Sequence, residues 1–306
     1  MGKTAFLFPG QGSQYVGMGK DFYEKLPVCR EVFEKAAKAS RVDVISLCFE
    51  ENELLHITEY TQIAMIAAEA AMLKALEERG IRADVAAGLS LGEYGALIAG
   101  GVLSMEDAFA LVRKRGIYMQ EAVPVGGAMT AVLGLDTDKI EAACEKTDGM
   151  VSIANYNCPG QTVITGEMAA VEAVALKCSE AGAKRCVPLK VSGPFHSPML
   201  ARAGEKLGKE LENVTLHPMA IPYIANVTAD YVEDITQVKA LLEKQVCSSV
   251  KWQQTMERMI ADGVDTFIEI GPGKTLSGFM RKINRDRKVY NIEKLEDLDK
   301  VVEALS

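Results

Sequence analysis

The stretch GLSLGEY at residues 88–94 constrains the fold most, because it sets Ser90 between two glycines in a G-x-S-x-G frame. A predicted strand at residues 84–89 precedes the serine, and LGEYGALIAG, which has the composition of a helix, follows it. Where a strand turns sharply into a helix, side chains beside the turn collide with backbone, so glycine is needed on both sides. The pattern therefore predicts an exposed nucleophilic serine at the end of a sheet, where α/β folds bind ligands. The alternative is a serine that only caps a helix in a loop.

Strands and helices alternate along the rest of the chain. TAFLFP at residues 4–9 is typical of a short buried strand, and an alanine-rich helix is predicted at residues 61–79. A second helix is predicted over residues 105–122, with Ser104 as its N-cap. This alternation favours the α/β class, with a mainly parallel sheet covered on both faces. Later elements are predicted helices near residues 199–212, 236–246 and 251–262, a strand at 264–270 and a final helix.

The predicted elements of residues 128–191 follow a different order from the rest of the chain, β-α-β-β-α-β, which is the ferredoxin-like motif. We therefore predict a small subdomain at 128–191, inserted into a large, discontinuous unit formed by residues 1–127 and 192–306. A chain of 306 residues is long enough to build both.

Composition excludes several functional classes. The net charge of −8 is unlike that of most nucleic-acid binders, and neither a G-x-G-x-x-G motif nor a Walker A loop is present. No apolar run is long enough for a membrane span, and the N-terminus lacks a secretory signal pattern. The seven cysteines are scattered and contain no C-x-x-C pair, which argues against a disulfide framework and a zinc site. We expect a cytoplasmic protein with no metal and no nucleic-acid or membrane partner.

A serine nucleophile needs a base, and the chain has three histidines. His56 lies within ELLHITEY, and His217 lies at the edge of a predicted strand. His196 lies in SGPFHSPML, a turn with two prolines and a glycine just after the insert. A rigid loop presents a base better than the interior of a regular element does, so we predict His196 as the base, with His217 as second choice.

The predicted helix at residues 105–122 carries a charge on its apolar side. Helical periodicity places Arg115 on the apolar stripe, whereas Arg113 and Lys114 point elsewhere. An unpaired buried guanidinium costs several kcal/mol. Either Arg115 pairs with an internal carboxylate, or it waits in a pocket for an anionic ligand that its planar fork can bind at two points. Helix periodicity alone does not choose between the two.

Together the motifs resemble the malonyl-CoA:acyl carrier protein transacylase family, in its stand-alone form, along essentially the whole chain. The motifs that carry the resemblance are FLFPGQGSQYVGMG (6–19), GLSLGEYGAL (88–97), RGIYMQEA (115–122), NYNCPGQTVITG (155–166), GPFHSPML (193–200) and EIGPGKTLSGFMRK (269–282). The resemblance implies an α/β-hydrolase-like core with the ferredoxin-like insert. It also implies malonyl-CoA and acyl carrier protein as partners, a CoA thioester as substrate and no permanently bound cofactor.

The resemblance also implies site residues. Ser90 is the nucleophile, His196 the base and Arg115 the ligand of the malonyl carboxylate. The oxyanion-hole amides fall on Gln11 and Leu91. The backbone carbonyl that orients the base falls on Gln245, and Asn155, Met119 and Phe195 line the substrate pocket. A bulky Phe195 beside the base leaves little room for a branched acyl group.

The implied reaction is a two-step transfer through a malonyl-serine ester, supplying fatty acid synthesis. Three alternatives remain: a polyketide-type acyltransferase, a serine esterase or thioesterase, and a non-catalytic module that kept the fold. An esterase usually has an acid between its serine and histidine in chain order; candidates are Asp107, Asp136, Asp138 and Asp148. An acidic carrier protein would need a local basic patch on this acidic chain. Candidates are Lys184, Arg185 and Lys190, or RKINRDRK at residues 281–288.

Overall fold

The computed structural model describes residues 2–123 and 125–305, so residues 1, 124 and 306 of the predicted large unit lie outside the description. In the large unit the described strands form a parallel sheet in the order β2-β1-β7-β8. The strands are β1 (Lys3–Phe8), β2 (Val85–Gly88), β7 (Val264–Ile270) and β8 (Lys288–Ile292). This sheet confirms the predicted α/β class with a mainly parallel core.

Helices cover both faces of the parallel sheet. Those before the insert are α1 (Lys20–Lys25), α2 (Pro27–Ser40), α3 (Val44–Phe49), α4 (Thr58–Glu78), α5 (Gly92–Ala99) and α6 (Met105–Ala122), with the 3₁₀ turn η1 (Leu54–His56). Those after it are α9 (Ala201–Glu212), α10 (Val238–Gln245), α11 (Trp252–Ala261), α12 (Thr275–Ile283) and α13 (Leu295–Leu305), with η2 (Pro198–Leu200) and η3 (Ile235–Gln237).

The continuous run of apolar residues in β1 follows from the burial of both faces of this strand. Phe6 and Phe8 belong to the core cluster that contains α2, α4 and α6, whereas Ala5 and Leu7 belong to the cluster that contains α11 and α12. Successive side chains of a strand point to opposite faces, so a strand covered on both sides needs apolar residues at every position. The carboxyl ends of β1 and β2 are thereby fixed, and the loops that follow them are held in place.

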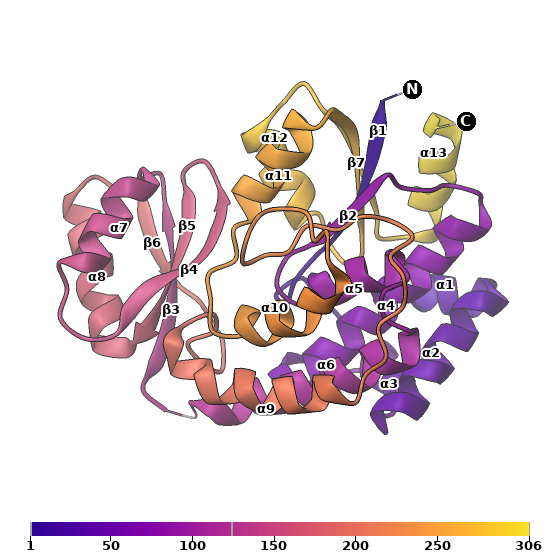
Figure 1. Cartoon of the computed structure of the whole chain (residues 1–306), viewed down its shortest axis with the longest axis horizontal. Helices are drawn as coiled ribbons and strands as arrows, with labels where there is room; N and C mark the ends of the chain where they lie inside the picture. The colour runs from indigo at the N-terminus through magenta and orange to yellow at the C-terminus, as the bar shows by residue number, and fades with distance from the viewer. Residues whose placement is uncertain (1, 124, 306) are drawn as a thin grey trace.

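The insert forms a second sheet with its own core. Strands β3 (Gly127–Leu133), β4 (Val151–Cys158), β5 (Gln161–Glu167) and β6 (Arg185–Pro188) pair antiparallel in the order β4-β5-β3-β6. Helices α7 (Thr137–Glu145) and α8 (Met168–Glu180) join these strands. This order is that of the predicted ferredoxin-like motif, and Figure 1 shows the insert beside the large unit. The exact boundaries at residues 127/128 and 191/192 stay a prediction.

Backbone hydrogen bonds join the insert to the large unit. Strand β4 is an edge strand, and Val250, between α10 and α11, covers its free side: Tyr156 N–H donates to the carbonyl of Val250, and Val250 N–H donates to that of Ala154. The hydroxyl of Ser249 also donates to the carbonyl of Ile153. These bonds hold β4 close to the end of the parallel sheet, next to the predicted serine turn.

The end of the chain differs from the prediction. One final helix was expected after residue 270, but the structure has α12, β8 and α13 there. Strand β8 alternates weakly and is only partly buried, so its sequence gives little strand signal. The strand expected beside His217 is also wrong, because that segment makes only isolated bridges, at Tyr223 and Ile224. Across the described part of the chain, no helix has the length and apolarity needed to cross a membrane.

Candidate active site

Ser90 lies on the sharp turn between β2 and α5, and its backbone is strained. Its φ is 54°, in the left-handed region that L-residues with side chains rarely adopt. A Cβ on Gly88 would lie 1.9 Å from the backbone of Gly92, and a Cβ on Gly92 would lie 2.1 Å from the carbonyl oxygen of Phe8. Both glycines are therefore required by backbone contacts, as the sequence pattern predicted, and the turn is a nucleophile elbow.

Asn226 fastens this turn from outside the motif. Its side-chain oxygen accepts the N–H of Ser90 at 2.7 Å, and its amide nitrogen donates to the carbonyl of Gly88, also at 2.7 Å. Asn226 is fully buried, so these bonds satisfy both ends of its amide. Sequence reasoning missed this residue, because its position beside the elbow depends on a contact across 136 residues.

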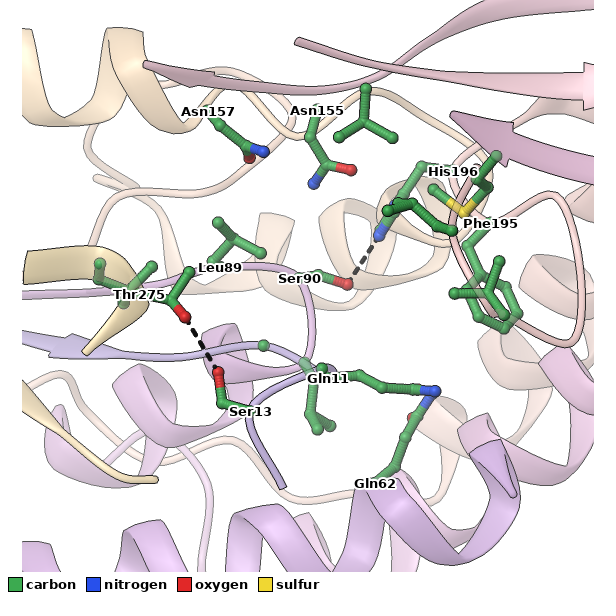
Figure 2. A pocket seen from close by; sticks show the side chains of 18 of the residues that line it. Gln11, Ser13, Gln62, Leu89, Ser90, Asn155, Asn157, Phe195, His196 and Thr275 are labelled. Carbon is green, nitrogen blue, oxygen red and sulfur yellow. Dashed lines mark hydrogen bonds between the residues drawn. The ribbon is translucent and has the colours of Figure 1, made fainter. Parts of the chain in front are cut away.

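The hydroxyl of Ser90 meets the ring of His196. Ser90 Oγ lies 2.7 Å from His196 Nε2 (Figure 2). On the other side of the ring, His196 Nδ1 lies 2.9 Å from the backbone oxygen of Gln245. A carbonyl can only accept, so Nδ1 must carry the proton. In the neutral ring Nε2 is then an acceptor, and the serine hydroxyl donates to it. The pair is arranged for proton transfer from serine to histidine.

The surroundings of His196 favour this neutral form. Burial and, after it, the positive charge of Arg115 lower the pKa of His196, and backbone hydrogen bonds at Gln245 and Ser248 oppose the shift, so that the pKa is about 4. At neutral pH the ring is therefore free to accept a proton. His196 also has a positive φ, of 60°, so both members of the pair sit on strained backbone.

Arg115 reaches the same place from α6. Its guanidinium donates to Ser90 Oγ at 3.2 Å, to the side-chain oxygen of Gln62 at 2.9 Å and to that of Gln245 at 3.0 Å. It is only 1% exposed, and no carboxylate of the described residues pairs with it. Two positions earlier on the helix, Arg113 forms an ion pair with Glu59 at 2.8 Å. Of the two sequence interpretations of Arg115, internal pairing with an acid is therefore wrong.

Gln245 links the parts of this site. Its backbone carbonyl accepts from His196 and its side-chain oxygen accepts from Arg115, while its side-chain nitrogen donates to the carbonyl of Ser90 at 2.8 Å and to Glu93 Oε2 at 2.7 Å. It is the last residue of α10 and is fully buried. A single side chain and its own carbonyl thus touch four groups of the site.

Two residues that line the same cavity as Ser90 have backbone amides without hydrogen-bond partners in the described part of the chain. In the hydrogen bonds of the described chain, neither the N–H of Gln11 nor that of Leu91 is used. Leu91 is the N-cap of α5, so its N–H lies at the positive end of that helix. The side chain of Gln11 donates to Thr58 Oγ1 at 3.1 Å, which ties the loop after β1 to the start of α4.

These groups open into a cavity of about 230 Å³. The large unit lines one side of it, with Gln11, Ser90, Leu91, Arg115 and Met119, and strand β4 of the insert lines the other with Asn155 and Asn157. Figure 2 shows the two asparagines on one side of the Ser90–His196 pair and Gln11 and Gln62 on the opposite side. Phe195 adds an aromatic wall beside the histidine. Of the nine predicted site residues, only Gln245 lies behind the wall rather than in it.

The family model described as acyl transferase domain matches residues 5–295. The chain belongs to the acyl transferase domain family. A malonyl CoA-acyl carrier protein transacylase from Bacillus subtilis is 44% identical to it over 310 aligned residues, covering 100% of this chain and 98% of that protein.

Solved structures of acyl transferase relatives agree with the fold. A malonyl CoA-acyl carrier protein transacylase from Clostridium perfringens matches with a TM-score of 0.95 and 44% identity, covering 99% of this chain and 97% of that one. A malonyl-transacylase in complex with a type II PKS acyl-carrier protein matches with a TM-score of 0.96 and 36% identity, covering 99% of both chains.

The acyl transferase site uses neither of the other histidines. His56 and His217 are exposed and do not line the cavity. The aspartates considered for an esterase do not reach His196 either, and Asp107 instead accepts from Ser104 at the start of α6. The ring of His196 is thus bonded to a carbonyl and not to an acid, and a hydrolase-type triad is absent from the described residues.

Sequence reasoning missed three polar residues of this acyl transferase site. They are Gln62 and Asn226, which hold the arginine and the elbow, and Glu93, which lies behind Gln245. Glu93 had a visible signal, since it is an acid in the first turn after the nucleophile, in a helix otherwise free of charge. Gln62 had only a weak signal, as a polar residue within a long apolar helix.

Proposed function

We propose that this acyltransferase moves a malonyl group from malonyl-CoA to the phosphopantetheine thiol of an acyl carrier protein. One observation carries the proposal: a serine hydrogen-bonded to a neutral histidine shares a cavity with a buried guanidinium that has no carboxylate partner. A malonyl thioester carries both the carbonyl that the serine attacks and the carboxylate that the guanidinium lacks.

In the first step Ser90 Oγ attacks the thioester carbonyl while its proton moves to His196 Nε2. The N–H groups of Gln11 and Leu91 stabilise the oxyanion of the tetrahedral intermediate. The carbon–sulfur bond then breaks, and the CoA sulfur leaves with the proton held by His196. A malonyl ester on Ser90 remains, and Arg115 holds its free carboxylate.

In the second step the thiol of the carrier protein gives its proton to His196 and attacks the ester carbonyl. The serine oxygen leaves and recovers that proton, so the enzyme returns to its starting state. Two half-reactions through one covalent form predict ping-pong kinetics. Both steps are complete without a permanently bound cofactor.

Gln245, Met119, Phe195 and Asn155 have supporting roles in this proposal. The carbonyl of Gln245 keeps the imidazole in the tautomer that accepts from serine. Met119, Phe195 and Asn155 shape the acyl cavity. The Phe195 ring next to the base restricts branching at the second carbon of the acyl group, which favours malonyl over bulkier units.

We further propose that the carrier docks on basic residues near the mouth of this cavity and that its malonyl product supplies fatty acid synthesis. Helix α12 contributes Thr275 and Phe279 to the cavity and carries exposed Arg281 and Lys282 at its end. On the insert, exposed Lys190 lies between Leu189 and Val191, which also line the cavity. Basic groups on both sides of the opening suit an acidic partner.

The mass of the intact protein after incubation with malonyl-CoA tests the reaction. We expect a single malonyl adduct in the wild-type protein, its removal on addition of carrier protein, and no adduct in Ser90→Ala. An adduct that persists in Ser90→Ala, or release of malonate to water instead of transfer to the thiol, would contradict the proposal.

A further inference from the structure

Glu93 lies in the first turn of α5, three residues after the nucleophile, and is 1% exposed. Its Oε2 accepts from the side-chain nitrogen of Gln245 at 2.7 Å and from the backbone N–H of Asn226 at 3.2 Å. Its Oε1 has no hydrogen-bond partner in the described part of the structure. A buried carboxylate is energetically costly unless its charge is compensated by a nearby positive charge and by hydrogen bonds.

The charge of Glu93 faces that of Arg115 across Gln245. The side-chain oxygen of Gln245 accepts from Arg115, and its side-chain nitrogen donates to Glu93. The glutamine amide therefore lies between the guanidinium and the carboxylate. The negative charge of Glu93 favours the charged form of Arg115, and the charge of Arg115 opposes protonation of His196. The two charged groups and the imidazole are therefore electrostatically coupled, and Gln245 is bonded to all three residues.

We propose that Glu93 is a positioning residue that acts through Gln245 and offsets the charge of Arg115, so that His196 can take the serine proton. This inference rests on the proposed transfer reaction. In hydrolase triads an acid bonded directly to the histidine stabilises the imidazolium. In this site a backbone carbonyl of Gln245 occupies that place, and the carboxylate of Glu93 is bonded to the side chain of the same glutamine.

The indirect arrangement follows from what the site must bind. A carboxylate bonded directly to Arg115 would compete with the malonyl carboxylate for the same guanidinium fork. With Gln245 interposed, Glu93 supplies negative charge while the fork stays free of an internal acid. The arrangement balances the site's charge without closing its specificity pocket.

The ionisation of Glu93 makes the inference testable by pH. Burial raises the pKa of Glu93 to about 7, against hydrogen bonds from Gln245 and Asn226 and the charge of Arg115, which lower it. The other titratable groups coupled to it are Tyr94 of α5 and Tyr223, both of which stay neutral because burial raises their pKa values. Glu93 is thus charged above pH 7 and loses its charge as the pH falls below 7.

The experiment measures the rate at which Ser90 is acylated, by rapid mixing and intact mass, with malonyl-CoA and with acetyl-CoA at pH values from about 5.5 to about 8.5, on both sides of the Glu93 pKa. The variant is Glu93→Gln, which keeps the shape and one acceptor oxygen. The matched control is Glu69→Gln, because Glu69 is also a fully buried glutamate with a raised pKa, but neither of its carboxylate oxygens has a hydrogen-bond partner within the described residues, so it lacks the bond to Gln245.

We expect Glu93→Gln to acylate about tenfold more slowly at pH 8 with both thioesters, the factor of one pKa unit. In the wild-type protein the acylation rate should fall towards that of Glu93→Gln as the pH is lowered below 7. The rate of Glu93→Gln should not change with pH in this range, whereas Glu69→Gln should show the same pH dependence as the wild-type protein. A loss confined to malonyl-CoA would overturn the inference, because Glu93 would then act on the carboxylate clamp alone.

A wild-type acylation rate that is flat between pH 6 and 8 would also overturn the inference, and this measurement does not depend on whether the variant folds. Failure of the wild-type protein to form any adduct on Ser90 would instead overturn the proposed function. The two failures are therefore distinguishable in one data set.

Discussion

The two sheets of the molecule contribute to the cavity in different ways. The parallel sheet and its helices supply the groups placed for chemistry: Ser90, Arg115 and Gln245, with His196 on the segment that returns from the insert. The insert supplies neutral wall residues such as Asn155, and no charged side chain of the insert lines the cavity.

The difference follows from how each region is held. The elbow has two glycines that no other residue could replace, a strained serine and several buried hydrogen bonds, so its atoms cannot shift without breaking core contacts. Strand β4 forms hydrogen bonds to the large unit through Val250 and Ser249, and its Cys158 packs in the core cluster of α11 and α12. Proton transfer tolerates only small displacements, whereas the shape of a wall can vary, so the chemistry lies in the rigid region.

The largest effect should come from Arg115→Ala in the parallel unit. Removing the guanidinium leaves the malonyl carboxylate unpaired in a buried cavity, so kcat/KM for malonyl-CoA should fall about 100-fold or more. Transfer from acetyl-CoA, which has no such carboxylate, should rise relative to malonyl-CoA. Steady-state kinetics with both thioesters measure the ratio.

Arg113→Ala is the matched control for that change, because Arg113 lies on the same helix but pairs with Glu59. It should lower stability slightly and leave the malonyl-to-acetyl ratio unchanged. If the ratio is the same in Arg115→Ala and the wild-type enzyme, Arg115 is not the carboxylate ligand.

Much of this rigid region could be predicted from sequence, because its signals are local. The glycines around Ser90 and the period of α6 that turns Arg115 inward both act within a few residues. The order of strands and helices likewise gave the ferredoxin-like sheet.

Contacts between distant segments could not be predicted in the same way. Asn226 and Gln62 act across many residues, and nothing beside them in the sequence shows which group they will meet. Helix periodicity could predict that Arg115 is buried but not whether an internal acid pairs with it, because that pairing depends on where Glu93 and Gln245 lie in space. The role of Gln245 itself came from the resemblance rather than from the local pattern.

A smaller effect should come from Asn155→Ala in the insert. Asn155 lines the cavity from β4 and makes no side-chain hydrogen bond to the other described residues, so it is free to bond the substrate. Losing one neutral hydrogen bond should raise KM for malonyl-CoA by up to about tenfold and leave kcat nearly unchanged. Initial-rate kinetics separate the two constants. A large fall in kcat would show that the insert takes part in the chemistry, and would break the contrast between the two sheets.

The smallest effect should come from reversing surface charge at the end of α12, with Arg281→Glu and Lys282→Glu together. Carrier affinity should fall a few-fold and more strongly at low salt, because exposed ion pairs are weak and screened. The rate of acylation by malonyl-CoA should not change. Titration of carrier protein at two salt concentrations measures the effect.

Two controls isolate the charge effect. Lys282 Nζ donates to Gln161 of the insert at 3.2 Å, so Lys282→Ala alone measures the loss of that contact between the two units. Arg30→Glu with Lys38→Glu, on α2 away from the cavity, makes the same change in net charge. If this distant pair weakens carrier binding as much as the pair on α12, the effect reflects net charge. The carrier would then be expected to dock on the insert, at Lys184, Arg185 and Lys190. The insert would in that case recognise the carrier as well as form a wall of the cavity.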